Sequence, residues 1–255
     1  MPTLKLAAAV AGTVVFALIE SLGGGKASAQ VASPGNQPKA VLELYTSQGC
    51  SSCPAADALL GEYAKKGGVV ALTLPVDYWD YLGWKDTLAD AKFTARQRAY
   101  AKSRGDGRIY TPQIVVNGLV HVNGAHANEI EAAITKTTTK LSGSRIPVSV
   151  ASKDGKITVD IGAMAEGDKS GDGAVWVAFL RKEIQVPVRK GENQGQMLTY
   201  HNVVREWKHA GTWNGKPMTL QVDRQSVKSD VDSCAVLLQG GMTGPIVGAA
   251  YLAKL

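Results

Sequence analysis

Two cysteines separated by two residues, Cys50 and Cys53, stand at the junction of a predicted strand and a predicted helix, and they constrain this chain more than any other feature. Residues 40–46 are mostly apolar, as is typical of a buried strand, and the polar residues 47–49 form a short turn. Pro54 suits the first turn of a helix, where a backbone N–H is not needed. The pair is therefore expected at the N-terminal end of a helix that directly follows a strand.

The position of this pair favours thiol–disulfide chemistry. A helix N-terminus carries unpaired N–H groups and about half a positive charge, and both favour a thiolate, which is the nucleophile in disulfide exchange. Cys50, nearer the helix mouth, is predicted to attack, within reach of incoming chains; Cys53, one turn in and more buried, is predicted to close the disulfide. No organic cofactor is needed, because the Cys50–Cys53 disulfide is itself the redox-active group. The expected partners are protein thiols or disulfides and a redox partner that resets the pair.

Other interpretations of the pair remain open. A structural disulfide that closes a loop of about four residues would contribute only roughly 2 kcal/mol. Capture of zinc or copper would use two thiolates, whereas a structural zinc site needs four ligands. His121 and His126 do not form a compact ligand motif with the cysteines, so no metal site is predicted. Two thiols without any role are disfavoured by the strand–turn–helix context.

A proline before a later predicted strand is the second element of the site. Thr111-Pro112 directly precedes the apolar residues 113–116. An X-Pro bond in a folded protein is cis in only about 5–6% of cases, and a proline at the start of an edge strand is the simpler interpretation. Beside the cysteine motif we favour a cis bond, which would present the backbone of Thr111 to a substrate chain that adds as a strand.

Three further side chains are weaker candidates for the same site. Glu43, on the predicted strand before the cysteines, is the candidate proton shuttle for Cys53 if burial raises its pKa; otherwise it is a surface carboxylate. Trp79 and Trp84 are candidate substrate-binding residues at the rim of the site, or else aromatic side chains that pack on the core.

The third cysteine, Cys234, opens an apolar run in a β-rich part of the chain and is interpreted as a buried apolar side chain.

The longer strings around these residues resemble a secreted thioredoxin-like family of unknown function. They are residues 43–54 (ELYTSQGCSSCP), 76–84 (VDYWDYLGW) and 110–113 (YTPQ). This resemblance covers residues 40–255, and the broader resemblance to the thioredoxin superfamily covers residues 40–140. It implies thiol–disulfide chemistry in which Cys50 attacks and Cys53 resolves. The chain differs from thioredoxins proper at Gly49, where they have Trp, and at Ser51-Ser52, where they have Gly-Pro; residues 77–104 resemble an insertion beside the site.

The chain divides into two parts that differ in their predicted secondary structure. After a linker over residues 30–39, residues 40–141 read in the order β-α-β-α-β-β-α, and the resemblance implies a thioredoxin-like α/β domain, a mixed sheet with flanking helices. Residues 145–255 alternate apolar and polar residues in short runs, which predicts a β-rich domain, an antiparallel sandwich.

The N-terminal residues resemble an export signal. Lys5 precedes an apolar run that is too short to span a bilayer, and Ala27-Ser28-Ala29 fits the rule for cleavage after small residues. We expect a signal peptide over residues 1–29 and a periplasmic or secreted protein that has no membrane contact after cleavage, in a compartment where disulfides persist. The net charge of +6 is spread along the chain and does not favour a nucleic-acid partner. The oligomeric state is not set by any sequence feature.

These observations predict an exported thiol–disulfide oxidoreductase that uses Cys50 and Cys53 on protein thiols or disulfides. Two alternatives belong to other classes of protein. One is a redox-inactive binding module on a thioredoxin fold, with a structural disulfide. The other is metal delivery, in which the two thiolates carry copper.

Overall fold

The computed structural model describes residues 1–2, 37–165 and 172–255. Apart from its first two residues, the expected signal peptide over residues 1–29 lies outside the described residues, and only residues 37–39 of the expected linker are described. Within the described ranges, no helix has the length and apolar character needed to cross a membrane.

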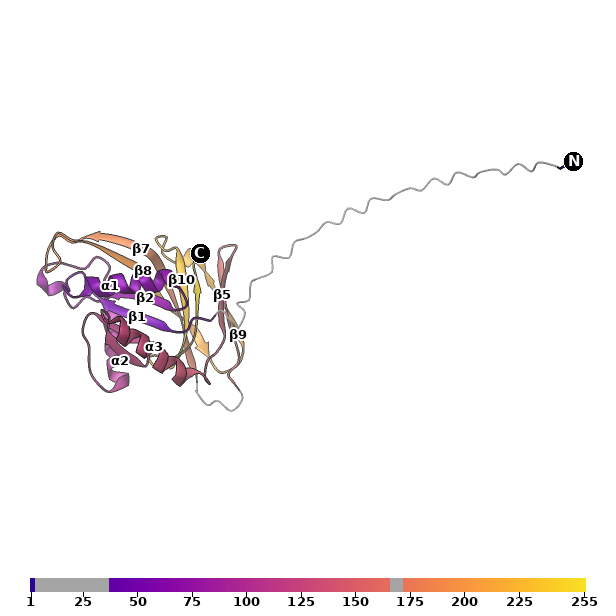
Figure 1. Ribbon diagram of the computed structural model, residues 1–255, viewed down its shortest axis with the longest axis horizontal. Helices are drawn as coiled ribbons and strands as arrows, with labels where there is room; N and C mark the ends of the chain where they lie inside the picture. Colours follow the sequence, from indigo (N-terminus) through magenta and orange to yellow (C-terminus); the bar gives the residue numbers. More distant parts are fainter. Residues whose placement is uncertain (3–36, 166–171) are drawn as a thin grey trace.

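The first half of the chain follows the predicted order of elements (Figure 1). Its elements are β1 (Val41–Thr46), α1 (Cys53–Lys66), β2 (Val70–Pro75), the short helix η2 (Asp80–Leu82), α2 (Ala91–Arg104), β3 (Gln113–Val116), β4 (Val120–Asn123) and α3 (Ala127–Leu141). Asn117 and Gly118 form the turn between β3 and β4, and both residues have positive φ, 50° and 68°, as two-residue hairpin turns require.

The second half is built from strands, as predicted. They are β5 (Val148–Lys153), β6 (Lys156–Ile161), β7 (Gly173–Pro187), β8 (Met197–Trp213), β9 (Met218–Asp223), β10 (Ser233–Gly240) and β11 (Ile246–Leu252), with a short helix η3 (Arg224–Ser226) after β9. Strand β7 is continuous over 15 residues and pairs with β8 in a long hairpin.

The strands of both halves join in one mixed sheet, and this corrects the expected succession of a mixed α/β sheet and a separate sandwich. Eight strands lie in the order β11-β10-β7-β8-β2-β1-β3-β4, and β5, β6 and β9 form a second, antiparallel sheet. The junction is the parallel contact of β2 with β8, where the Thr73 hydroxyl donates to the carbonyl of His201 (2.6 Å) and the Asn202 amide donates to that of Ala71 (3.1 Å). All six residues of β2 are buried, so its outer edge needs a partner, and β8 supplies it.

Part of the sandwich prediction is nevertheless confirmed, because the large sheet packs against the three-stranded sheet in the second half. An apolar core between them contains Val159 and Ile161 from β6, Val177 and Phe179 from β7, and Val236 from β10.

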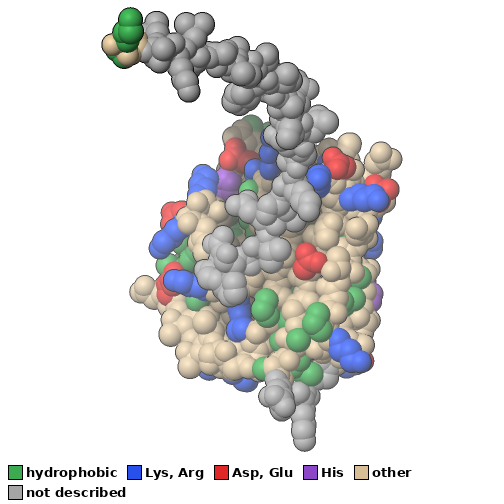
Figure 2. Space-filling view, turned by 90° about the vertical axis from the view of Figure 1, so that its right-hand side faces the viewer, with side chains coloured by type: hydrophobic (Ala, Val, Ile, Leu, Met, Phe, Trp, Pro, Cys, Tyr) green, Lys and Arg blue, Asp and Glu red, His purple; other side chains and the backbone are tan. Residues whose placement is uncertain are grey.

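On the face beside β5 and β9, Lys and Arg side chains are interspersed with Asp and Glu (Figure 2).

The alternation of β1 determines which helix each of its side chains meets. Leu42 and Leu44 pack with α1 and α3, whereas Val41 and Tyr45 pack with α2 on the opposite face of the sheet. Glu43 therefore faces α2, and Thr46 faces α1. This division decides which acidic group can reach the cysteines.

Candidate functional site

Cys50 and Cys53 form a disulfide at the start of α1, as the sequence predicts. The two sulfurs are 2.11 Å apart and the two Cα atoms 5.4 Å apart. Helix α1 begins at Cys53, with Pro54 in its first turn, and the N-cap residue Ser52 makes no side-chain hydrogen bond to the helix. The first turn is therefore not capped by its own side chain, and its positive end adjoins the disulfide.

Both cysteines are buried, so the expectation that Cys50 lies within reach of incoming chains is wrong for the disulfide form. Cys50 is 1% exposed and Cys53 is 0% exposed. The intervening residues Ser51 and Ser52 are exposed, and the hydroxyl of Ser52 lies 3.5 Å from the sulfur of Cys50. The sequence predicts the position of the pair but not what covers it.

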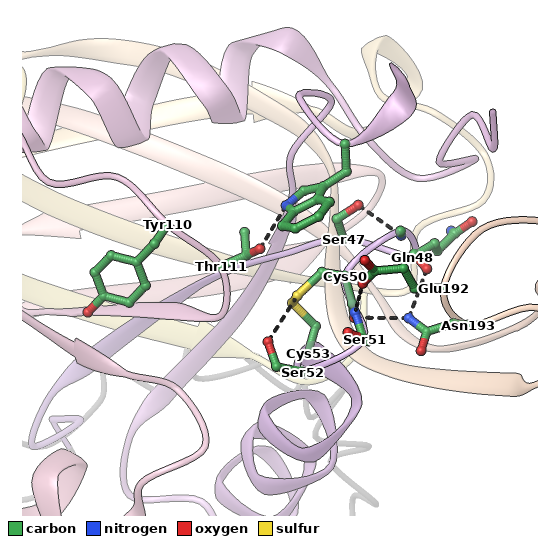
Figure 3. The surroundings of a disulfide bond; sticks show 12 residues. Ser47, Gln48, Cys50, Ser51, Ser52, Cys53, Tyr110, Thr111, Glu192 and Asn193 are labelled. Atoms are coloured by element: carbon green, nitrogen blue, oxygen red, sulfur yellow. Dashed lines mark hydrogen bonds between the residues drawn. A yellow bond between two sulfur atoms is a disulfide. The ribbon is translucent and has the colours of Figure 1, made fainter. Parts of the chain in front are cut away.

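The hairpin tip, residues 188–196 between β7 and β8, contacts the backbone of the cysteine motif (Figure 3). The buried amide of Asn193 donates to the carbonyl oxygens of Gln48 (3.0 Å) and Cys50 (2.9 Å). The exposed carboxylate of Glu192 accepts a hydrogen bond from the backbone N–H of Ser51 (3.0 Å), and hydrogen bonding with the side chain and the backbone of Ser51 lowers the pKa of Glu192. These contacts join residues more than 140 positions apart in the chain.

The turn before the cysteines is held from the segment between β2 and α2. The buried carboxylate of Asp86 accepts from the backbone N–H of Gln48 (2.8 Å), and burial raises the pKa of this carboxyl. The indole of Trp84 donates to the Gln48 side chain (2.8 Å) and packs against the apolar cluster that contains Val188 of the hairpin tip. Trp84 thus supports the turn and the hairpin tip rather than standing free as part of a rim.

Trp79 and Thr111 lie together on the other side of the disulfide. The indole N–H of Trp79 donates to the hydroxyl of Thr111 (2.8 Å), which is labelled in Figure 3. The Thr111–Pro112 peptide bond is cis, as we favoured. Trp79 also packs on Gly49, where a Cβ atom would lie only 3.1 Å from that of Trp79. Among the described residues, neither the backbone N–H nor the C=O of Thr111 has a hydrogen-bond partner.

Glu43 does not occupy the position that a proton shuttle for Cys53 requires. Its buried carboxylate pairs with the guanidinium of Arg96 (2.6 Å) and accepts a hydrogen bond from the hydroxyl of Tyr100 (2.6 Å), both from α2. Helix α1 and Cys53 lie on the opposite face of the sheet. Glu43 is buried as the shuttle hypothesis requires, but alternation along β1 directs it to the wrong helix.

Asp57 is the acidic residue on the same side as the cysteines. It follows Cys53 by four residues on α1, so the two side chains share one face of the helix, and it is 4% exposed. Neither carboxyl oxygen has a hydrogen-bond partner, and the hydroxyls of Thr46 and Tyr200 are likewise buried without partners. Burial raises the pKa of Asp57 well above its usual range, an effect that the nearby Thr46 partly offsets.

The remaining predicted residues lie apart from the disulfide. Cys234 is fully buried in β10 with a free thiol, as interpreted, and burial raises its pKa to about 12. His121 contacts Tyr110 and Asp106, and His126 contacts Glu129. In residues 37–165 and 172–255, no group of three or more His, Cys, Asp or Glu side chains is placed to hold a metal ion.

Sequence reasoning missed Asp57, Asp86, Glu192 and Asn193. Asp57 carries a weak signal, because it stands at helical spacing from Cys53 among apolar residues. Residues 191–195 (Gly-Glu-Asn-Gln-Gly) are typical of a polar turn between strands, but nothing in them indicates which part of the chain they contact.

These features define the class: a mixed α/β protein with a disulfide at the N-terminal end of a helix, in contact with a hairpin of the same sheet. The chain belongs to the family described as "Protein of unknown function (DUF1223)", which matches residues 41–239. The resemblance to a family of unknown function is thus confirmed at this level.

Two solved structures are similar to this one. The crystal structure of protein AGR_C_4864 from Agrobacterium tumefaciens is 38% identical, with a TM-score of 0.75 over 85% of this chain and 94% of that chain. HBP35 of Porphyromonas gingivalis is 11% identical, with a TM-score of 0.56 over 86% of this chain and 76% of that one, a likeness of fold alone. No curated protein sequence matches the chain.

Proposed function

We propose that this protein is an exported, thioredoxin-like thiol–disulfide oxidoreductase whose reactive group is the Cys50–Cys53 pair. The observation that carries the proposal is the disulfide at the start of α1, where the first turn has no side-chain cap. In the reduced protein, the positive end of the helix stabilises a thiolate on Cys50. The disulfide itself is consistent with export, because such bonds persist in oxidising compartments.

The first step is attack of the Cys50 thiolate on one sulfur of a substrate disulfide. The substrate S–S bond breaks, one substrate sulfur leaves as a thiolate, and a mixed disulfide joins Cys50 to the other. Cys53 then attacks the Cys50 sulfur of this mixed disulfide and releases the second substrate thiolate. Two electrons pass from the pair to the substrate, and an external dithiol must reduce the pair before the next cycle; the reverse sequence oxidises a dithiol substrate.

The thiol of Cys53 must lose its proton before it attacks, and Asp57 is the group we assign to accept it. Once it is ionised, above its raised pKa, the buried carboxylate of Asp57 is a stronger base than an exposed carboxylate. Asp57 stands one helical turn from Cys53 and has no other partner for its oxygens. Asp57 therefore takes the role that the sequence suggested for Glu43.

The substrate chain binds beside Thr111 in this proposal. The unpaired N–H and C=O of Thr111 are suited to pair with an extended substrate segment. The indole of Trp79 fixes the Thr111 side chain and provides an apolar surface next to that segment.

The proposal is tested by the reduction of a disulfide-bonded peptide with dithiothreitol, with and without the protein. The wild-type protein should accelerate the reaction, Cys50→Ser should abolish the acceleration, and Cys234→Ser, which removes a buried thiol remote from α1, should retain it. Equal rates with the wild-type protein and with Cys50→Ser would refute the proposal.

A second candidate function, a binding module with a locked disulfide, is favoured by the burial of both cysteines. It predicts that the wild-type pair resists dithiothreitol under native conditions and that the protein does not accelerate exchange. The same assay therefore separates the two candidates.

A further inference from the structure

The hairpin tip places a negatively charged side chain, Glu192, against the cysteine motif at the N-terminal end of α1. The Ser51 N–H that Glu192 binds lies between the two cysteines, at the mouth of the helix. This is the region in which the helix would stabilise a thiolate on Cys50. A carboxylate and a thiolate at this point share one positive end and repel each other, so Glu192 opposes the ionised form of Cys50.

The hairpin tip is attached firmly enough to act in this way. Val188, 2% exposed, joins an apolar cluster with Leu88 and Leu198, and Trp84 packs against that cluster. Asn193 is 1% exposed and contributes the two hydrogen bonds to the turn that carries Cys50. The tip is thus a built part of the site, with an apolar base and a polar end.

We propose that the hairpin tip is a cover that shields Cys50, in which Asn193 holds the cover closed and Glu192 disfavours the Cys50 thiolate. The inference rests on the proposed function and extends it to the control of reactivity. Because the thiolate belongs to the reduced form, a group that opposes it favours the disulfide over the dithiol. Glu192 is therefore a positioning and tuning residue that makes the reduced pair a stronger reductant.

Other charged groups surround the site and must be held constant in a test. Asp86 binds the turn before Cys50, Asp80 accepts a hydrogen bond from Asp86, and Asp57 lies on α1. Arg189 and Lys190 of the hairpin tip form no ion pair with Glu192 among the described residues. A change of Glu192 alone leaves all of these in place.

The test compares Glu192→Gln and Asn193→Ala with the wild-type chain. Glu62→Gln is the matched control, because Glu62 is an exposed acid on α1 away from its N-terminal end. Two readouts are followed: the pH dependence of Cys50 alkylation by iodoacetamide after reduction, and the fraction of reduced pair in dithiothreitol redox buffers. Glu192→Gln should lower the midpoint of the alkylation profile and shift the redox equilibrium about two- to fivefold toward the dithiol.

Asn193→Ala should raise the alkylation rate of Cys50 at high pH without moving the midpoint, and Glu62→Gln should change neither readout. A Glu192→Gln profile that superimposes on the wild-type profile would overturn the role of Glu192. Equal alkylation rates for Asn193→Ala and wild type would overturn the cover. Both readouts use small reagents only, so they judge this inference even if the protein fails to exchange disulfides with a peptide, the failure that refutes the proposed function.

Discussion

Replacing Asp57 with Asn should make the free energy of unfolding fall less as the pH rises. Burial raises the pKa of Asp57 well above its ordinary value of 3.8, so the folded protein keeps a proton that the unfolded chain has lost. Above the ordinary pKa of 3.8, the unfolded state binds fewer protons than the folded state. The free energy of unfolding therefore falls by about 1.4 kcal/mol per pH unit until the pKa of folded Asp57 is reached. At low pH both states are protonated, and the cost disappears.

Urea unfolding of the disulfide form, measured at several pH values from about pH 4.5 upward, tests this reasoning. The difference in unfolding free energy between Asp57→Asn and wild type should grow by about 1.4 kcal/mol per pH unit, because all other titrating groups are common to both proteins. Glu62→Gln, which removes an exposed carboxylate from the same helix, is the matched control for the loss of an acid on α1. A constant difference for Asp57→Asn would mean that folding does not raise the pKa of Asp57, and the assignment of Asp57 as a strengthened base for Cys53 would lose its support.

The other predictions concern stability and thiol reactivity. Arg96→Met should lower the free energy of unfolding by about 3–5 kcal/mol, because it leaves the buried carboxylate of Glu43 without its cationic partner, and an additional Glu43→Leu change should recover part of the loss. Cys234 should resist iodoacetamide in the folded protein and react in urea, because burial raises its pKa to about 12; rapid labelling under native conditions would contradict the buried position. Replacement of both Cys50 and Cys53 by Ser should cost only about 2 kcal/mol in urea unfolding, because the disulfide closes a short loop, and a much larger loss would favour a structural bond.

Local sequence patterns predict the elements of this fold well because each element depends on neighbouring residues. The apolar run of β1, the proline in the first turn of α1 and the Asn117-Gly118 turn all act over a few positions. The disulfide follows from the same local reasoning, because both cysteines lie between the end of a strand and the first turn of a helix.

Contacts between distant segments could not be predicted, because alternation and spacing carry no information about partners. The contact of β2 with β8 depends on one paired position, Thr73 with Val203, and it turns two expected domains into strands of one sheet. The hydrogen bond of Asn193 to the carbonyl of Cys50 joins residues 143 positions apart, which only the folded chain brings together. Glu43 shows a related limit: its burial was a sound hypothesis, but the helix that it faces is a property of the whole sheet.

The central claim is that Cys50 is a nucleophile, and trapping of a mixed disulfide tests it most directly. A chain with Cys53→Ser and Cys234→Ala retains one cysteine, Cys50, and is incubated with a disulfide-bonded peptide before the products are weighed by mass spectrometry. One peptide should add to Cys50 as an adduct that dithiothreitol releases, and Cys50→Ser should form no such adduct. A Cys50 thiol that iodoacetamide labels readily while no peptide adduct accumulates would contradict the claim.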